Sequence, residues 1–167
     1  TSKIFMKDIC KKHNIQTAKY SIFDKEKNAL NFLNEIDFPT IIKADGLAAG
    51  KGVIIANNKE QAIENIKNIM SKKIFGRSGE NIIIEEFIEG EEISFFALVD
   101  TNGFVLPLTI AQDHKKIGEG DTGLNTGGMG AYSPVPFVKQ NQINEFVIKF
   151  VNPIINDLKV NTIFFSG

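Results

Sequence analysis

Apolar residues recur three and four positions apart in several segments of the chain, which is the spacing of an amphipathic helix. The clearest segment is Lys59–Lys72, where Asn58 and Gln61 resemble a capping box at the N-terminus. A second helix is predicted over Gln140–Asn156, in which Pro153 bends the helix or ends its hydrogen-bond ladder. Weaker helical patterns cover Lys3–His13 and Lys25–Ile36.

Short apolar runs between these helices predict strands. The runs are Ala18–Phe23, Thr40–Ala44, Val53–Ala56, Ile82–Glu86, Ile93–Val99, Phe104–Ala111 and Thr162–Phe165. Asn102 and Gly103 both tolerate positive φ, so we expect the two strands that flank them to pair as a hairpin. The sequence therefore predicts a mixed α and β chain.

Two glycine-rich stretches interrupt this pattern. Asp45–Gly52 is short and lies between two predicted strands, whereas Lys115–Ser133 is predicted to form one long irregular loop of functional importance. Gly118, Gly120 and Gly123 have the spacing G-x-G-x-x-G, but they follow a charged loop and open no helix. They therefore fail the structural test for a dinucleotide site.

Composition and charge exclude several classes of protein. The chain has 167 residues, of which 43% are hydrophobic, so it can bury a core in one domain or two small lobes. A net charge of −1 provides no overall field for nucleic acid or an anionic membrane. No apolar run approaches the roughly 18 residues of a membrane span.

Single residues and the chain ends add three expectations. Cys10 is the single cysteine, which rules out an internal disulfide and favours the cytoplasm. Cys10 and His13 lack further ligand-spaced partners, so we interpret them as a core thiol and a surface imidazole rather than a metal site. The chain begins at Thr1 without methionine and stops after an apolar run, so we expect a fragment of a longer protein.

The segment from Ile41 to Gly52 has the composition of a phosphate site. Lys43 lies at the end of a strand, a glycine-rich turn exposes backbone N–H groups, and Lys51 adds a second cation. The segment is not a Walker A loop, because its spacing is one residue short and Gly52 stands where serine or threonine would hold magnesium. A glycine-rich hairpin with exposed lysines is an equal alternative for this segment alone.

The acidic segment after Ile82 is a second candidate. An extended backbone there suits an adenine edge, and Glu92 suits ribose hydroxyls, although a solvated acidic turn is the favoured interpretation of this segment in isolation. Strand alternation places Glu85 and Glu86 on opposite faces, and without the register we favour Glu85 as the one facing the adenine.

The third candidate combines polar side chains with glycines between Gln112 and Pro134. Asp113, His114 and Lys115 precede Asn125 and Thr126, a set that suits the orientation of a small polar substrate. A flexible surface loop is the alternative.

Taken in this order, the segments resemble the ATP-grasp superfamily, and within it the phosphoribosylamine–glycine ligase family, also called glycinamide ribonucleotide synthetase. The resemblance is carried by Ser2-Lys3 with Phe5 and Lys7-Asp8, by Ile42–Val53, by Glu85-Glu86-Phe87 with Gly90-Glu91-Glu92, and by Gln112–Lys115 through Asn125–Pro134. The last of these segments narrows the resemblance from the superfamily to the family.

The resemblance implies an α+β, ATP-grasp fold. Two mixed α/β lobes with largely antiparallel sheets would close on ATP, with the C-terminal part truncated in this chain. Residues 1–16 and 87–167 would belong to the larger, incomplete lobe. Residues 17–86 would form the small lobe that carries the phosphate loop.

The resemblance also implies roles for individual residues. Lys3 and Lys43 would contact the phosphates, the Asp45–Gly52 loop would cover them, Glu85–Ile88 would bind the adenine, and Glu92 the ribose. The implied nucleotide set is Lys3, Lys43, Asp45, Gly50, Lys51, Gly52, Glu85, Glu86, Phe87, Ile88 and Glu92. The implied substrate set is Asp113, His114, Lys115, Asn125, Thr126, Gly127, Gly128 and Met129, with Lys43, Asp113 and Lys115 as catalytic residues.

The implied reaction joins glycine to 5-phosphoribosylamine with ATP, through a glycyl phosphate, in purine biosynthesis. Mg²⁺ or Mn²⁺ would be held by a Glu and an Asn beyond residue 167, so we expect no metal ligand here and an inactive isolated chain. The expected partners are the two substrates and the rest of the polypeptide, without nucleic acid or membrane. Another ATP-grasp carboxylate–amine ligase and a noncatalytic nucleotide-binding module are the alternatives.

Overall fold

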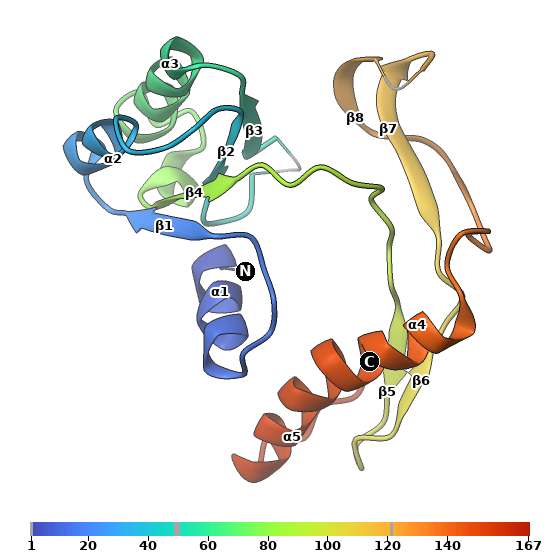
Figure 1. Ribbon diagram of the computed structural model, residues 1–167. Helices are drawn as coiled ribbons and strands as arrows, with labels where there is room; N and C mark the ends of the chain where they lie inside the picture. The colour runs from blue at the N-terminus through green and yellow to red at the C-terminus, as the bar shows by residue number, and fades with distance from the viewer. Residues whose placement is uncertain (1, 49–50, 121) are drawn as a thin grey trace. The chain divides into compact units, whose positions relative to one another are not determined.

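The computed structural model describes residues 2–48, 51–120 and 122–167, and for Leu124 and Asn125 it describes the backbone alone. The chain divides into two compact units, Thr1–Glu89 and Gly90–Gly167. Figure 1 shows the helices and strands of both units, and each unit is considered separately below. Within the described residues, no helix combines the length and the apolar character that crossing a membrane requires.

A four-stranded antiparallel sheet forms the centre of the first unit. Its strands are β1 (Tyr20–Phe23), β2 (Thr40–Ala44), β3 (Val53–Ala56) and β4 (Ile82–Glu86), in the order β1-β4-β2-β3. The register places Ile42 of β2 opposite Ile54 on one side and Ile84 on the other. The strands β2, β3 and β4 occupy the residues predicted from the apolar runs, and β1 begins two residues later than expected.

Three helices and a 3₁₀ turn accompany this sheet. They are α1 (Lys3–Lys12), α2 (Glu26–Phe32), α3 (Lys59–Met70) and η1 (Gly76–Gly79). The cap of α3 is confirmed, since Asn58 Oδ1 accepts a hydrogen bond from the Gln61 N–H at 2.9 Å. The helix α2 ends before the expected Ile36, because the N–H groups of Asn34 and Glu35 turn to carbonyls three residues back.

The core of the first unit lies between the sheet and the helices α2 and α3, which Figure 1 shows together on one side of it. Strand alternation turns every second residue of β2 and β4 toward these helices. The buried cluster comprises Ala29, Leu33, Ile42, Ala44, Ala56, Ala62, Ile66, Ile69, Ile82 and Ile84. The intervening residues of the same strands therefore face away from α2 and α3.

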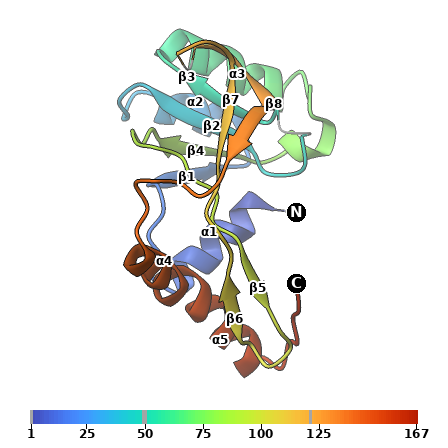
Figure 2. The same cartoon turned by 90° about the vertical axis from the view of Figure 1, so that its right-hand side faces the viewer.

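The second unit contains two hairpins and one long helical segment. The strand β5 (Ala97–Val99) pairs with β6 (Val105–Pro107), and β7 (Gln112–Gly118) pairs with β8 (Thr122–Tyr132). The helical segment consists of α4 (Gln140–Phe146), a π-helical turn η2 (Val147–Val151) and α5 (Asn152–Val160). Figures 1 and 2 both show this segment beside β5 and β6, with the β7–β8 hairpin extending away from it.

Two predictions for this unit are confirmed. The hairpin turns at Gly103, whose φ is 76° and whose N–H donates to the Asp100 carbonyl at 2.8 Å. The hydrogen-bond ladder changes at Pro153, because proline has no N–H and the π-helical turn directly precedes α5.

The expected irregular loop over Lys115–Ser133 is wrong, because most of it forms the β7–β8 hairpin. The pairing shifts register between His114 and Lys116 and again between Lys116 and Gly118. Glycine weakens a strand without preventing backbone hydrogen bonds to a neighbouring strand, and bulges accommodate the irregular spacing.

The expected strand Thr162–Phe165 is also wrong. Thr162 has a left-handed φ of 56°, which turns the chain after α5. The segment forms no strand, and instead Val99 exchanges two backbone hydrogen bonds with Gly167, at 2.8 and 3.0 Å.

Candidate functional site

The polar side chains of the first unit gather on the sheet face opposite α2 and α3. Lys43 of β2 and Glu85 of β4 alternate there with Ile41 and Ile83. Together with α1 they line a pocket of about 430 Å³. The lining residues are Lys3, Met6, Lys7, Thr17, Ala18, Ile41, Lys43, Glu85, Glu86 and Ile88. The pocket therefore brings together Lys3, Lys43, Glu85, Glu86 and Ile88 from the predicted nucleotide set.

Glu85 is the central acid of this pocket and is almost completely buried. Its Oε2 lies 2.7 Å from Lys43 Nζ, and its Oε1 lies 3.1 Å from Lys7 Nζ. The Thr40 hydroxyl donates to the Glu85 carbonyl at 2.7 Å and fixes the backbone at this point. Two lysines thus face one buried carboxylate, which leaves positive charge available for an anionic ligand.

Lys3 connects the start of α1 to the end of β2. Its Nζ donates to the carbonyls of Ala44 at 2.7 Å and Gly46 at 3.0 Å. Burial lowers the pKa of Lys3; the Asp45 carboxylate opposes this shift and the Lys43 ammonium adds to it. A polyphosphate near Nζ would raise this pKa again, because an opposite charge favours the charged form.

Asp45 supports the N-terminal end of the helix α1, whose N-cap residue is Ser2. One of its carboxylate oxygens accepts hydrogen bonds from the Ser2 hydroxyl at 2.9 Å and from the Ile4 N–H at 2.8 Å. An acid at this position complements the positive end of the helix dipole. Asp45 therefore positions α1, and with it Lys3, against the loop that follows β2.

The glycine-rich loop is packed closely where it is described. A Cβ at Gly46 would lie 2.6 Å from Ser78 Oγ, and a Cβ at Gly52 would lie 2.6 Å from the Ala48 Cβ. Lys51 is exposed, and its N–H donates to the Ala48 carbonyl at 2.8 Å. The predicted contact at Gly50 lies outside the described residues.

The segment after β4 leaves backbone groups available. Glu86 is tied to β1, because the Lys19 N–H donates to its Oε1 at 2.8 Å and its own N–H donates to the Lys19 carbonyl at 3.0 Å. By contrast, the backbone groups of Phe87 and Ile88 form no hydrogen bond to another described residue. Free N–H and C=O groups beside an exposed Ile88 suit the edge of a purine base.

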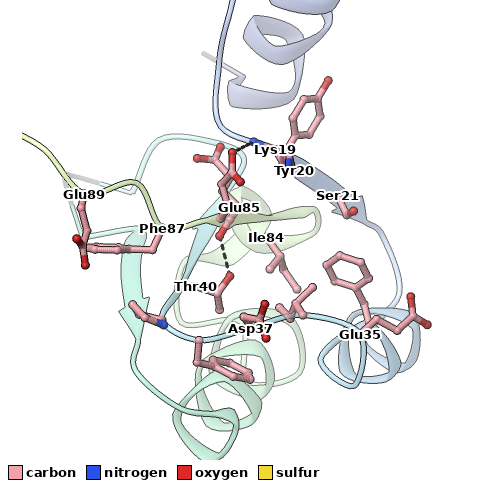
Figure 3. Close-up of a pocket in the computed structure, with 15 residues that line it drawn as sticks. Lys19, Tyr20, Ser21, Glu35, Asp37, Thr40, Ile84, Glu85, Phe87 and Glu89 are labelled. Atoms are coloured by element: carbon pink, nitrogen blue, oxygen red, sulfur yellow. Dashed lines mark hydrogen bonds between the residues drawn. The ribbon is translucent and has the colours of Figure 1, made fainter.

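A larger pocket of about 630 Å³ lies near the same strands but has different chemistry (Figure 3). Lys19 is the cation among its lining residues, whereas the acidic ones are Glu35, Asp37, Glu85, Glu86 and Glu89. This charge repels phosphate, so the smaller pocket suits a nucleotide better. Phe87 of the predicted nucleotide set lines the larger pocket instead.

Lys115 is the centre of the polar side chains in the second unit. It forms an ion pair with Glu92, and its Nζ lies 4.0 Å from Asp113 Oδ1. The hydrogen bond that Lys115 donates to Glu92 raises the pKa of Lys115; burial opposes this shift, and the charges of Glu92 and Asp113 add to it. Glu92 is therefore engaged with Lys115 in this structure.

The rest of the predicted substrate set lies on the β7–β8 hairpin. The Thr126 hydroxyl donates to the Lys115 carbonyl at 2.9 Å and accepts from the Gly128 N–H at 3.1 Å. A Cβ at Gly127 or Gly128 would meet no atom within 4 Å, so this backbone is open to a small ligand. His114 lies on β7 and Met129 is exposed on β8, while the side chain of Asn125 lies outside the described residues.

Lys7 is a residue of the pocket to which we assigned no role from the sequence. The signal was present, because Lys7 lies one helical turn after Lys3 and therefore on the same face of α1. Lysine is almost never buried without a partner, but burial itself is not visible in a single sequence.

The mixed helices and antiparallel sheets of the chain are those of the ATP-grasp fold class. Residues 1–167 match the family model described as "Phosphoribosylglycinamide synthetase, ATP-grasp (A) domain", and the chain belongs to this family. The predicted family and fold class are therefore confirmed.

Named relatives agree with this assignment. The chain is 51% identical over 150 residues to the chloroplastic phosphoribosylamine–glycine ligase of Arabidopsis thaliana, and 42% identical over 166 residues to the same enzyme of Fusobacterium nucleatum. These matches cover 90% and 99% of the chain but 28% and 39% of the relatives. The crystal structure of phosphoribosylamine–glycine ligase from Thermotoga maritima is 32% identical with a TM-score of 0.84, over 99% of this chain and 42% of that one.

The family implies a divalent metal ion, and the described residues do not fit one. No three His, Cys, Asp or Glu side chains come together in the described ranges in a way that could hold a metal ion. Glu85, the carboxylate at the centre of the pocket, is already paired with two lysines.

Proposed function

We propose that the pocket around Lys43 binds ATP, and that the protein to which this chain belongs ligates glycine to 5-phosphoribosylamine. The products are glycinamide ribonucleotide, ADP and phosphate. The observation that carries the proposal is the meeting of Lys3, Lys43 and the free backbone of Ile88 around one positively charged pocket. The family of the chain and the names of its relatives support the choice of substrates.

Each part of the nucleotide has a partner of suitable chemistry. Lys3 and Lys43 bind the phosphates, and Lys51 with the N–H groups of the Asp45–Gly52 loop covers them. Glu85–Ile88 bind the adenine, with Ile41 and Ile88 supplying apolar contact. Glu92 binds the ribose, and this requires it to leave Lys115.

The reaction needs positioning and charge neutralisation more than a protein nucleophile. A glycine carboxylate oxygen attacks the γ-phosphorus, and the bond to ADP breaks. The amine of phosphoribosylamine then attacks the glycyl carbonyl carbon, loses a proton and displaces phosphate. Lys43 stabilises the charge on the transferred group, while Asp113 and Lys115 orient the acyl phosphate and the amine.

The open backbone of β8 suits the small substrate. Gly127 and Gly128 carry no side chain to exclude it, and Thr126 holds the turn of the backbone in place. His114, Asn125 and Met129 complete the proposed substrate contacts. Another carboxylate–amine ligase would use the same ATP pocket and differ at this hairpin.

The remaining expectations concern the whole polypeptide. Residues 1–16 and 87–167 are proposed to belong to a larger lobe and 17–86 to a smaller one, and the isolated chain is proposed to be inactive without the rest of its polypeptide. Mg²⁺ or Mn²⁺ is expected to bind with ligands outside residues 1–167. The cytoplasm is the expected location, although the plant relative is named chloroplastic.

The test is a comparison of nucleotide binding and turnover. ATP at roughly a hundred times its dissociation constant should raise the unfolding midpoint by about 5–10 °C. Lys43→Met should reduce this shift by about half or more at the same ATP concentration. Lys11→Met, an exposed position on α1, should leave it unchanged. The full-length polypeptide should release ADP when glycine and phosphoribosylamine are both present, whereas residues 1–167 should not.

Two results would contradict the proposal. If ATP does not shift the unfolding midpoint of the folded full-length polypeptide, ATP binding is excluded. If the rate of ADP release does not depend on glycine, this ligase activity is excluded. ATP binding without release on any carboxylate–amine pair would favour the noncatalytic alternative.

A further inference from the structure

The buried carboxylate of Glu85 is shared by two lysines that differ in freedom. Lys7 Nζ donates to the Thr17 hydroxyl at 2.6 Å and the Ala18 carbonyl at 3.3 Å, and it lies 4.9 Å from the centre of the Tyr20 ring. Its side chain is 9% exposed. Lys7 is thus held in place by its surroundings, whether or not a nucleotide is bound.

Lys43 is the more accessible partner. Its side chain is 25% exposed, and its Nζ is 2.7 Å from Glu85 Oε2. Lys43 must turn toward a phosphate if it is to neutralise charge there, and this move weakens its contact with Glu85. A buried carboxylate that loses its counter-ion is strongly unfavourable, so the move requires a second cation beside Glu85.

The second oxygen of Glu85 faces that second cation. Oε1 is 3.1 Å from Lys7 Nζ but accepts no hydrogen bond from the described residues. It therefore has acceptor capacity left for Lys7 when Lys43 departs.

We propose that Lys7 is a positioning residue that acts as the permanent counter-ion of Glu85 and so allows Lys43 to leave for the nucleotide phosphates. Lys7 does not itself touch the nucleotide. The inference rests on the proposed function, because it assigns a reason for Lys43 to move. It adds a residue outside the predicted nucleotide set.

The test is a double-mutant cycle on ATP affinity, measured by calorimetry in the full-length polypeptide. Lys7→Met should weaken ATP binding at least roughly 10-fold, since Lys43 then remains the sole counter-ion of Glu85. In the Glu85→Gln background the same change should alter affinity less than about threefold, because a neutral amide needs no counter-ion. Lys11→Met, at an exposed position one turn beyond Lys7, is the matched control and should change nothing.

A second readout needs no nucleotide. Lys7→Met should lower the unfolding midpoint more than Lys43→Met does, because loss of Lys43 leaves Glu85 paired with the buried Lys7. If Lys7→Met alone fails to fold, the Lys7→Met/Glu85→Gln double variant should fold and bind ATP as tightly as Glu85→Gln does.

Each other result overturns the inference. An equal loss of affinity in both backgrounds would mean that Lys7 contacts the nucleotide, and no loss in either would mean that Glu85 needs only Lys43. If the unsubstituted polypeptide binds no ATP, the proposed function is overturned instead. The measurement on the unsubstituted polypeptide therefore distinguishes this outcome from the other two.

Discussion

Replacing Gly46 with alanine tests how closely the loop after β2 approaches the 3₁₀ turn η1. The added Cβ would lie 2.6 Å from Ser78 Oγ and 2.9 Å from Ser78 Cα. The Oγ can rotate away, but the Cα belongs to the backbone and cannot. The loop or the turn must therefore shift, and such overpacking costs about 1–3 kcal/mol.

The same shift would disturb the anchor of Lys3. The Gly46 N–H donates to the Ser78 carbonyl at 3.1 Å, and the Gly46 carbonyl accepts from Lys3 Nζ at 3.0 Å. We therefore expect Gly46→Ala to lower the unfolding midpoint by about 2–12 °C, and to weaken ATP binding as well.

The control is Gly127→Ala on β8. A Cβ there would meet no atom within 4 Å, and Gly127, like Gly46, is free of left-handed φ. Both substitutions reduce the freedom of the unfolded chain equally, so their difference isolates the steric clash. Scanning calorimetry of both variants gives the comparison. If the two midpoints agreed within about 1 °C, the close approach at Ser78 would not constrain the loop.

Four further predictions follow from individual side chains. Lys43→Met should weaken ATP binding at least roughly 10-fold in a calorimetric titration, because a charge-assisted phosphate contact is lost. The pKa of Lys3 is lowered before binding, so ATP binding at alkaline pH should take up protons, which titrations in two buffers of different ionisation enthalpy detect. The raised pKa of Lys115 means that its pair with Glu92 stabilises the fold below about pH 10.5, so the midpoint difference from Lys115→Met should disappear as pH rises above that value. Ile66→Ala should lower the free energy of unfolding by about 2–5 kcal/mol in urea, because Ile66 is fully buried.

The strands of the first unit were predictable because the short apolar runs in the sequence agree with the tertiary structure. Thr40–Ala44 alternates buried and intermediate positions, and the glycine-rich loop follows it directly. The β7–β8 hairpin was not predictable, because glycine has low strand propensity and its pairing depends on a partner strand rather than on local preference. The prediction of a strand at Thr162–Phe165 was wrong for the opposite reason. An apolar run favours a strand locally but does not provide a second strand to pair with.

The sequence alone does not determine which face of the sheet Glu85 and Glu86 each occupy. Alternation placed them on opposite faces, but the register against β2 decides which face each one occupies. That register pairs Glu85 with Ile41 and Glu86 with Thr40, through contacts between residues more than forty positions apart. Glu85 therefore shares the face of Lys43, and the preference for Glu85 as the residue facing adenine stays a prediction.

The orientation of the Asp45 carboxylate affects which atoms of the glycine-rich loop are left to face the phosphates. Its carboxylate is held by the Ser2 hydroxyl and the Ile4 N–H, so this negative charge is turned toward α1. The same contacts place Lys3, the next residue after the helix cap, over the carbonyls at the end of β2. An acid inside a phosphate loop is thus compatible with anion binding, because the helix N-terminus takes up its charge. The phosphates are then left to the N–H groups of the loop, to Lys51 and to Lys43 of β2. Asp45→Asn should therefore preserve the start of α1 and change ATP affinity little in a calorimetric titration.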